Sequence, residues 1–152
     1  MVSFYIEDLK KFMSLLLAGN LFDNWEMVEA KAETFCEFHV NGRVKKEFFD
    51  TEEREYLHEY TQWREVRPLF YEVIKGKKLP LTFSVVFIAP REWIEGEEKR
   101  LLQIRYTKQG CVLITGFSKT EFSLDKTKEQ EWDEYVAKWL KEQGIVCLRS
   151  NY

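Results

Sequence analysis

The clearest pattern in the chain is a run of alternating residues between Val28 and Val40. Apolar or small side chains occupy the even positions, and charged side chains occupy most of the odd positions. A period of two over these thirteen residues predicts one long strand with one buried face and one face in water. This alternation is typical of antiparallel sheets, because parallel sheets are usually covered on both faces.

The dipeptide Asn41-Gly42 follows this run and predicts a hairpin turn. A two-residue loop there would place Phe38 opposite a lysine. A three-residue loop would instead place it opposite Val44 and keep apolar residues on one face. We therefore expect residues 43–48 to form the partner strand in this second register.

Three segments repeat apolar residues at spacings of three and four, which predicts amphipathic helices. They cover about residues 7–18, 61–75 and 126–143. A glycine ends each segment, and we expect Gly19 to adopt the left-handed conformation of a C-terminal cap.

Further strands are predicted in the second half of the chain, where apolar residues alternate over shorter stretches. Three of them cover about residues 81–87, 102–106 and 111–115, and residues 146–148 could add an edge strand. Residues 50–60 fit either the start of a helix or a short strand, so their structure stays open.

The predicted fold class is α+β, with an antiparallel sheet of about five strands and three helices gathered mainly on one face. This arrangement buries every apolar stripe. The chain has 152 residues and contains no linker, repeat or low-complexity segment, so we expect one domain over residues 1–152.

Composition and charge narrow the classes of protein to which the chain can belong. An aromatic fraction of 16% gives a strong core and excludes a disordered chain. The net charge of −3 makes a dedicated nucleic-acid binder unlikely, because such domains are usually basic. The three cysteines are an odd number and lie far apart in the sequence, which does not suggest a disulfide framework. We find no signal peptide and no apolar stretch long enough to cross a membrane, so we expect a cytoplasmic protein with no membrane segment.

Several short motifs, spread over nearly the whole chain, are specific in combination. Together they resemble an uncharacterised family of anaerobic Gram-positive bacteria that carries only the label of a domain of unknown function. The resemblance implies a bacterial protein and supports the domain boundary, but it implies no activity. The family favours Thr-Gly-Thr-Ser at one motif, where this chain has a phenylalanine in place of the second threonine. The motifs are Phe22-Asp23, Trp63, Arg67-Pro68, Ile74-Lys75-Gly76-Lys77 with Pro80, Thr115-Gly116-Phe117-Ser118, Asp125-Lys126 and Trp132-Asp133.

The segment between the last central strand and the third helix is the best candidate for a ligand site. Helix N-termini present unpaired N–H groups that attract anions, and lysines and hydroxyl groups surround this one. The alternative interpretation is that Ser123 or Asp125 simply caps the helix while Lys119 is solvated. The candidate ligand-binding residues are Ser118, Lys119, Thr120, Asp125 and Lys126.

A second candidate surface is a basic patch built from two lysine clusters. The lysines at the end of the second helix are also explained by the favourable placement of cations at a helix C-terminus. No aromatic residue is interleaved with them, so stacking on single-stranded nucleic acid is not indicated. The candidate residues are Lys45, Lys46, Lys75, Lys77 and Lys78.

Catalytic and metal-binding patterns are not apparent in the sequence. Cys36 falls on the predicted buried face of the long strand, which favours an inert thiol, whereas Cys111 follows a turn and could be exposed. The two histidines have no metal-ligand spacing, and we expect His39 on the wet face of the strand. We therefore predict no catalytic residue, no metal and no cofactor.

The sequence thus favours a non-catalytic binding or regulatory domain that contacts a protein, a second copy of itself or a small anionic ligand. Two alternatives stay open. One is a small enzyme with a site near Ser118, Lys119 and Asp125, and the other is a nucleic-acid accessory protein that uses the basic patch.

Overall fold

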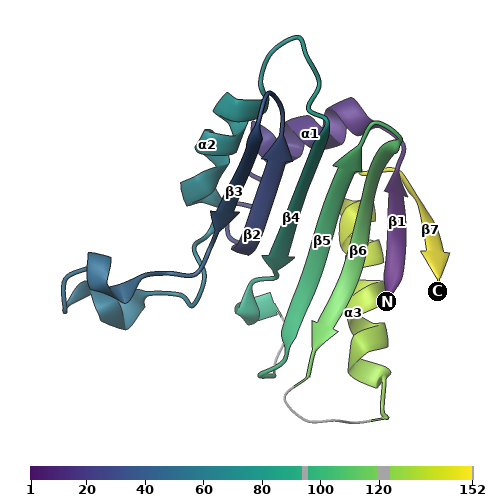
Figure 1. Cartoon of the computed structure of the whole chain (residues 1–152). Helices are drawn as coiled ribbons and strands as arrows, with labels where there is room; N and C mark the ends of the chain where they lie inside the picture. The colour runs from purple at the N-terminus through teal and green to yellow at the C-terminus, as the bar shows by residue number, and fades with distance from the viewer. Residues whose placement is uncertain (94–95, 120–123, 152) are drawn as a thin grey trace.

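An open antiparallel sheet of seven strands forms the framework of the computed structural model, which describes residues 1–93, 96–119 and 124–151. Three α-helices lie behind this sheet in Figure 1, so its other face is uncovered. The strand order is β3-β2-β4-β5-β6-β1-β7. The strands are β1 (Val2–Ile6), β2 (Glu26–Glu33), β3 (Glu37–Asn41), β4 (Thr82–Ile88), β5 (Lys99–Thr107), β6 (Gly110–Ser118) and β7 (Cys147–Asn151).

The helices match the three predicted amphipathic segments closely. They are α1 (Leu9–Leu17), α2 (Trp63–Ile74) and α3 (Thr127–Glu142), and three 3-10 turns cover Lys46–Phe48, Glu53–Tyr56 and Arg91–Trp93. Gly19 does not adopt the left-handed conformation predicted for it, whereas Gly144 after α3 does, with φ of 74°. The α+β class is confirmed, but the sheet has seven strands rather than about five.

The long strand predicted from Val28 to Val40 is wrong, because two strands and a turn occupy this region. Glu33 pairs with Glu37 across a three-residue turn, and Ala32 pairs with Phe38. Because the turn has three residues, even-numbered positions of β2 pair with even-numbered positions of β3. The alternation of buried and exposed residues therefore continues from β2 into β3 without a break. Cys36 consequently lies exposed in the turn and not in the core.

Gly42 marks the point where the chain leaves the sheet, and no hairpin turns back there. Its N–H donates to the Val28 carbonyl at 2.8 Å, and a Cβ atom at this position would lie 1.7 Å from the Met27 oxygen. Only glycine fits such a close approach. The predicted pairing of Phe38 with Val44 is therefore wrong.

Residues 43–60, which we call the arm, project from the sheet at the lower left of Figure 1. The arm returns to the sheet at Thr61, whose N–H donates to the Gly42 carbonyl at 2.8 Å. The region left open by the sequence therefore contains the 3-10 turn Glu53–Tyr56 and an isolated bridge between Arg43 and Tyr60, but no named strand.

The core lies between the sheet and the three helices, and aromatic residues dominate it. The Trp63 indole N–H donates to the Leu16 carbonyl at 2.9 Å, and the Arg67 guanidinium contacts the Asp23 carboxylate at 2.8 Å. The Trp63 contact joins α2 to the C-terminal end of α1, where helix carbonyls lack partners within the helix, and the Arg67 contact joins α2 to the connection between α1 and β2. The largest fully buried aromatic side chains are Phe4, Phe12, Phe22, Trp25, Trp63, Phe70, Phe83, Phe87 and Trp132.

Candidate functional site

The structure places the predicted anion-binding residues around the start of α3. The Lys119 ammonium donates to the Asp125 carbonyl at 3.0 Å, and the Asp125 carboxylate accepts from the Thr127 N–H and hydroxyl at 2.9 and 2.6 Å. These bonds from Thr127 hold the pKa of Asp125 below its usual range. Asp125 thus accepts from the first N–H of α3 although Lys126 holds the N-cap position, and Lys119 contacts the Asp125 carbonyl where the alternative interpretation expected it to be solvated.

The remaining members of that predicted site are only partly placed. Ser118 ends β6, and Lys126 is exposed at the N-cap position of α3. Thr120 lies outside the described residues, as does Ser123. Anion binding at this segment stays a prediction.

The predicted basic patch falls into two separate clusters. Lys45 and Lys46 lie in the arm, whereas the other cluster belongs to the α2–β4 connection at the opposite end of the sheet (Figure 1). In that second cluster, Lys75 contacts the Glu72 carboxylate at 2.6 Å, and this hydrogen bond raises the pKa of Lys75. The members of the second cluster are Lys75, Lys77 and Lys78.

Thiols and histidines are not gathered into a reactive site. Cys111 is buried, against the exposure that its sequence position suggested, and desolvation raises its pKa to about 12. His39 lies on the uncovered sheet face, where its imidazole is 3.4 Å from the Glu29 carboxylate. Over the described ranges, no group of three or more His, Cys, Asp and Glu side chains could hold a metal ion. No helix among those residues is long and apolar enough to cross a membrane.

A buried carboxylate joins α3 to the sheet. The Thr115 hydroxyl donates to Asp133 at 2.6 Å and accepts from the Val2 N–H at 2.9 Å. Both side chains are largely buried, Thr115 at 1% and Asp133 at 6% exposure. Asp133 also lines a cavity of about 530 Å³ between α3 and β7. Because Thr115 is out of reach of solvent, we interpret this pair as a structural link between β1, β6 and α3.

A second cavity of about 400 Å³ continues along α3 and is mainly apolar. Its floor is formed by the buried side chains of Phe4 and Ile145, and Ala137 leaves room on the helix wall. Gly144 turns the chain from α3 into β7, which places the strand beside the helix. We call this cavity the α3–β7 groove, lined by Phe4, Ala137, Lys141, Gly144, Ile145, Val146, Cys147 and Arg149.

The charged side chains at the groove are mostly basic. Arg149 contacts Glu134 at 2.6 Å, which raises the pKa of Arg149 and lowers that of Glu134. Lys141 forms no ion pair with any residue in the described part of the chain. Lys11 donates to the Gly144 carbonyl at 3.0 Å in an adjoining cavity of about 60 Å³. Arg149 is thus neutralised by Glu134, and Lys141 is the groove cation that has no such partner among the described residues.

The backbone of β7 is unpaired on its outer side. The backbone N–H of Glu7 donates to the Val146 carbonyl at 3.1 Å, and the register of β1 and β7 pairs Tyr5 with Leu148. Hydrogen-bonded pairs alternate along an antiparallel ladder, so the N–H and C=O groups of Cys147 and Arg149 point outward. Among the strands that the structure describes, none lies beyond β7 (Figure 1).

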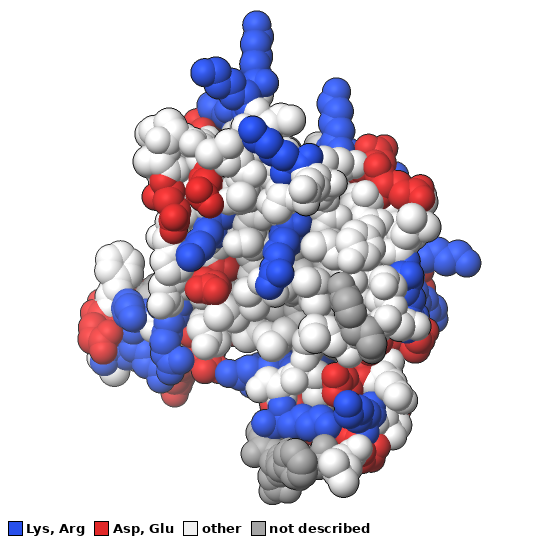
Figure 2. Space-filling model, turned by 45° about the vertical axis from the view of Figure 1, so that its right-hand side comes forward, with Lys and Arg blue, Asp and Glu red and all other residues white. Residues whose placement is uncertain are grey.

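The uncovered sheet face next to β7 is also apolar. Tyr5 and Leu148 are 45% and 64% exposed, and they lie side by side in the register of β1 and β7. Figure 2 turns this side of the molecule forward and shows a broad uncharged area. The β7 edge thus combines free backbone groups, an apolar groove on one face and apolar side chains on the other.

The match to known families agrees with the resemblance noted in the sequence. The model of DUF5721, a family of unknown function, matches residues 15–147. The chain belongs to this family. Comparison with curated proteins and with solved structures found no match. The matched part of this DUF5721 chain runs from within α1 to the first residue of β7.

The DUF5721 motifs mostly form the internal links of the fold. Asp23 and Arg67 contact each other, as do Thr115 and Asp133. The Trp132 indole N–H donates to the Leu101 carbonyl at 3.0 Å. These motif residues explain how the helices are fixed to the sheet, and they do not converge on a reactive centre.

Sequence reasoning missed the α3–β7 groove in this DUF5721 chain. The strand β1 was not predicted, so the buried Phe4 that forms the groove floor had no assigned place. Two signals were available. Ala137 is a small residue beside the apolar stripe of the third helix, and an apolar run follows Gly144.

Proposed function

We propose that this protein is a binding domain that takes up an extended protein segment in the α3–β7 groove. The segment adds to the sheet as a further antiparallel or parallel strand alongside β7. The observation that carries this proposal is the outward-facing backbone of Cys147 and Arg149 beside an apolar cavity. Strand addition of this kind draws affinity from backbone hydrogen bonds and specificity from pockets for alternate side chains.

The groove chemistry defines the bound segment. Side chains of an added strand alternate between its two faces. Those on the helix side would enter the cavity over Phe4 and Ile145, and those on the other side would lie beside Leu148. Lys141 favours a carboxylate next to the apolar anchors. We therefore expect a segment with alternating apolar residues and an acidic residue beside them.

We also propose a bacterial origin and a cytoplasmic location, as the sequence suggests. The enzyme alternative near Ser118, Lys119 and Asp125 and the nucleic-acid alternative also stay predictions. Asp125 already accepts two hydrogen bonds from Thr127, and the lysine clusters lie apart, so neither alternative gains support from geometry.

A displayed library of random linear peptides, selected on the whole protein, tests the proposal. Selected peptides should have the alternating apolar and acidic pattern, and calorimetry should show that they bind. Ala137→Trp fills the groove, so it should weaken binding about tenfold or more, whereas Lys138→Trp on the exposed side of α3 should not.

A second variant pair tests the backbone of the edge strand. Cys147→Pro removes an outward N–H at the first residue of β7, where proline is tolerated. Cys147→Val alters the same side chain but keeps the donor. Binding should be lost only in the proline variant. Equal binding by both variants, or a selection that enriches no such peptide, would overturn the proposal.

A further inference from the structure

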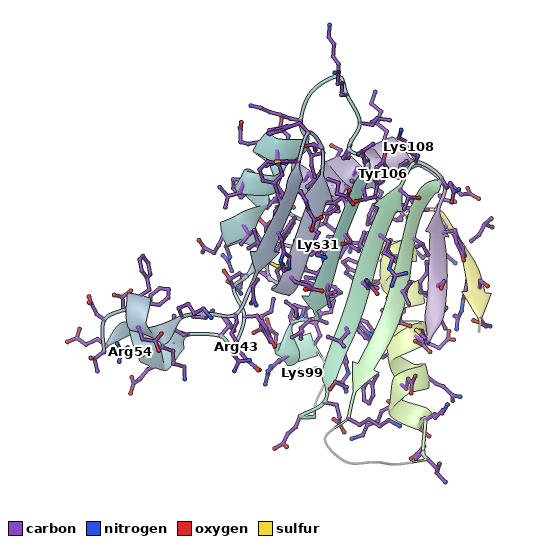
Figure 3. The ribbon with its side chains drawn as sticks, viewed as in Figure 1. Lys31, Arg43, Arg54, Lys99, Tyr106 and Lys108 are labelled. Carbon is purple, nitrogen blue, oxygen red and sulfur yellow. The ribbon has the colours of Figure 1, made fainter. Side chains whose placement is uncertain are left out.

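The strand β7 already has the extended conformation that an added strand must adopt. It pairs with β1 at five positions, from Asn151 opposite Val2 to Cys147 opposite Ile6. Its backbone is therefore ordered before any contact is made, whereas a flexible segment would lose conformational entropy on binding. The arm does not shield this edge, because Arg54 at the tip of the arm lies across the molecule from β7 (Figure 3). The β7 strand of a second copy is thus ready for pairing.

Two copies of β7 can pair antiparallel about a two-fold axis, which makes the two sides of the contact equivalent. Residues that exchange hydrogen bonds across such a pair must both direct their backbone groups outward. In β7 these residues include Cys147 and Arg149. An axis at Leu148 places Cys147 of each copy opposite Arg149 of the partner copy. Both of these pairs can then exchange two hydrogen bonds, which gives four in total.

Neighbouring positions for the axis fit the strand less well. An axis at Arg149 places two guanidinium groups opposite each other. An axis at Cys147 places Arg149 opposite Ile145, whose N–H already donates to the Leu140 carbonyl at 3.0 Å. The structure therefore favours the axis at Leu148.

On the uncovered sheet face, this register covers apolar side chains that are otherwise exposed. Leu148, 64% exposed, meets its counterpart in a pair without hydrogen bonds, where opposite side chains lie closest. Tyr5, 45% exposed, is the neighbour of Leu148 in β1, so four apolar side chains form a row across the two copies. Pairing with the β3 edge of another copy would instead bring Leu148 toward the polar side chains of Glu37 and His39.

On the helix side, the same register gives Lys141 a carboxylate. Lys141 lines the groove beside Cys147 and has no ion pair in the part of the chain that the structure describes. Arg149 holds Glu134 at 2.6 Å, and this arginine lies opposite Cys147 of the partner copy. Glu134 of each copy therefore lies on the side of Lys141 of the other copy. The contact thus includes two symmetric pairs of opposite charge.

The charges along this edge balance, so two copies do not repel each other as a whole. The side chains that line the three cavities along α3 and β7 include four cations and four carboxylates. The Met1 ammonium adds one positive charge and Glu7 adds one negative charge, while Lys138 and Glu142 lie 3.9 Å apart on α3. The side chains of the cavities are Lys11, Lys126, Lys141 and Arg149, with Asp8, Glu129, Asp133 and Glu134.

We propose that β7 pairs with β7 of a second copy about a two-fold axis at Leu148, which joins the two sheets into one continuous sheet. This inference rests on the proposed function, because β7 is the edge to which a strand is added, and it names that strand. The carboxylate expected beside the added strand then comes from α3 of the same partner. Both copies use the same surface, so the contact closes as a dimer and does not grow further.

Sedimentation of the intact protein from about 1 μM to about 1 mM tests the association. The wild-type protein should form a dimer and nothing larger. Leu148→Lys places two ammonium groups opposite each other, so it should be monomeric. Leu69→Lys changes an equally exposed leucine, 62% exposed on α2, and should dimerise like the wild type. A wild-type protein that is monomeric throughout, or a Leu148→Lys variant that still dimerises, overturns the inference.

Disulfide formation under mild oxidation tests the register. The chain for this test carries Cys36→Ser, which removes the exposed thiol of the β2–β3 turn. Leu148→Cys should give a linked dimer, because Cα atoms in such a pair lie about 4.5 Å apart, within the range of a disulfide. Ser150→Cys on the same face should stay unlinked. Linkage through the native Cys147, or through Arg149→Cys in place of Leu148→Cys, overturns the proposed axis.

Mixing two charge variants tests the contact on the helix side. Lys141→Glu and Glu134→Lys each place like charges opposite each other, so each alone should dimerise about tenfold more weakly or worse. In their mixture both pairs are again of opposite charge, so a dimer of one chain of each kind should form. A mixture that dimerises no better than the separate variants overturns this contact. Peptide binding to a monomeric wild type would leave the proposed function intact, whereas a dimer that no selected peptide separates would leave only the inference standing.

Discussion

The two edges of the sheet differ in how they meet solvent. On the β3 edge, Glu37 lies 3.9 Å from Lys31, and His39 lies 3.4 Å from Glu29, so polar and charged side chains occupy the face that no helix covers. On the β7 edge, Leu148 is exposed and the α3–β7 groove opens on the helix side. Proteins commonly protect edge strands with charges, because unpaired backbone invites pairing with other chains.

This difference indicates which edge is built for contact. Both edges present free backbone groups and an exposed apolar side chain, Phe35 in the β2–β3 turn and Leu148 in β7, but β7 also lines a cavity that alternate residues of a partner could fill. Free backbone alone would attract any strand, whereas a cavity of defined shape selects among them. The comparison therefore supports β7 as a binding edge and β3 as a protected one.

The largest expected effect comes from Gly42→Ala, which disrupts the sheet at the end of β3. The added Cβ would meet the Met27 oxygen at 1.7 Å, so β2 and the arm must separate. We expect a loss of about 3 kcal/mol or more in the free energy of unfolding, measured by urea denaturation. Gly116→Ala is the control, since its Cβ would only approach the Leu101 side chain at 3.2 Å. Equal losses in both variants would contradict this account.

A smaller loss is expected on the β7 side from Thr115→Val. Valine keeps the shape but removes the donor to Asp133, whose side chain is almost fully buried. An unsatisfied buried polar group costs about 1–3 kcal/mol, so the free energy of unfolding should fall by that amount. Thr107→Val, at an exposed position of β5, is the control: it removes only a solvent-exposed bond from the Gln109 N–H at 3.2 Å and should lower stability less. A neutral Thr115→Val would show that the link between α3 and β6 does not stabilise the fold.

The sequence revealed the helices and the one-sided sheet because periodicity reports directly on burial. Alternation could not reveal the turn at residues 34–36, since a three-residue turn preserves parity and Cys36 continues the pattern. It also missed β1, whose Val2, Ser3 and Phe4 are all buried and so show no alternation. The two sequence signals of the groove, Ala137 and the apolar run after Gly144, could not place it, because it depends on β1 pairing with β7, two segments from opposite ends of the chain.

A charged side chain placed on β7 tests which edge binds peptides and should have little effect on stability. Leu148→Lys gives β7 an exposed charge like those of β3, and we expect a change within about 0.5 kcal/mol in the free energy of unfolding. Binding of the selected peptides should nevertheless fall about tenfold or more by calorimetry. The same peptides should bind the His39→Lys variant as they bind the wild type. If His39→Lys weakens peptide binding and Leu148→Lys does not, the peptides bind at β3, and β7 is not the binding edge.

The smallest expected effect concerns the ion pair at the rim of the groove. Arg149 lowers the pKa of Glu134 below its ordinary value of 4.5, so the folded state binds a proton there less readily than the unfolded chain does. The stabilisation by this pair is therefore complete above the unfolded pKa and is lost as pH falls through the lower folded pKa. Thermal unfolding between neutral pH and acid should show a slightly steeper loss of stability for the wild type than for Glu134→Gln. The difference should be small because Glu134 is exposed to solvent. Parallel pH profiles for the two proteins would show that the Arg149–Glu134 pair does not stabilise the folded state.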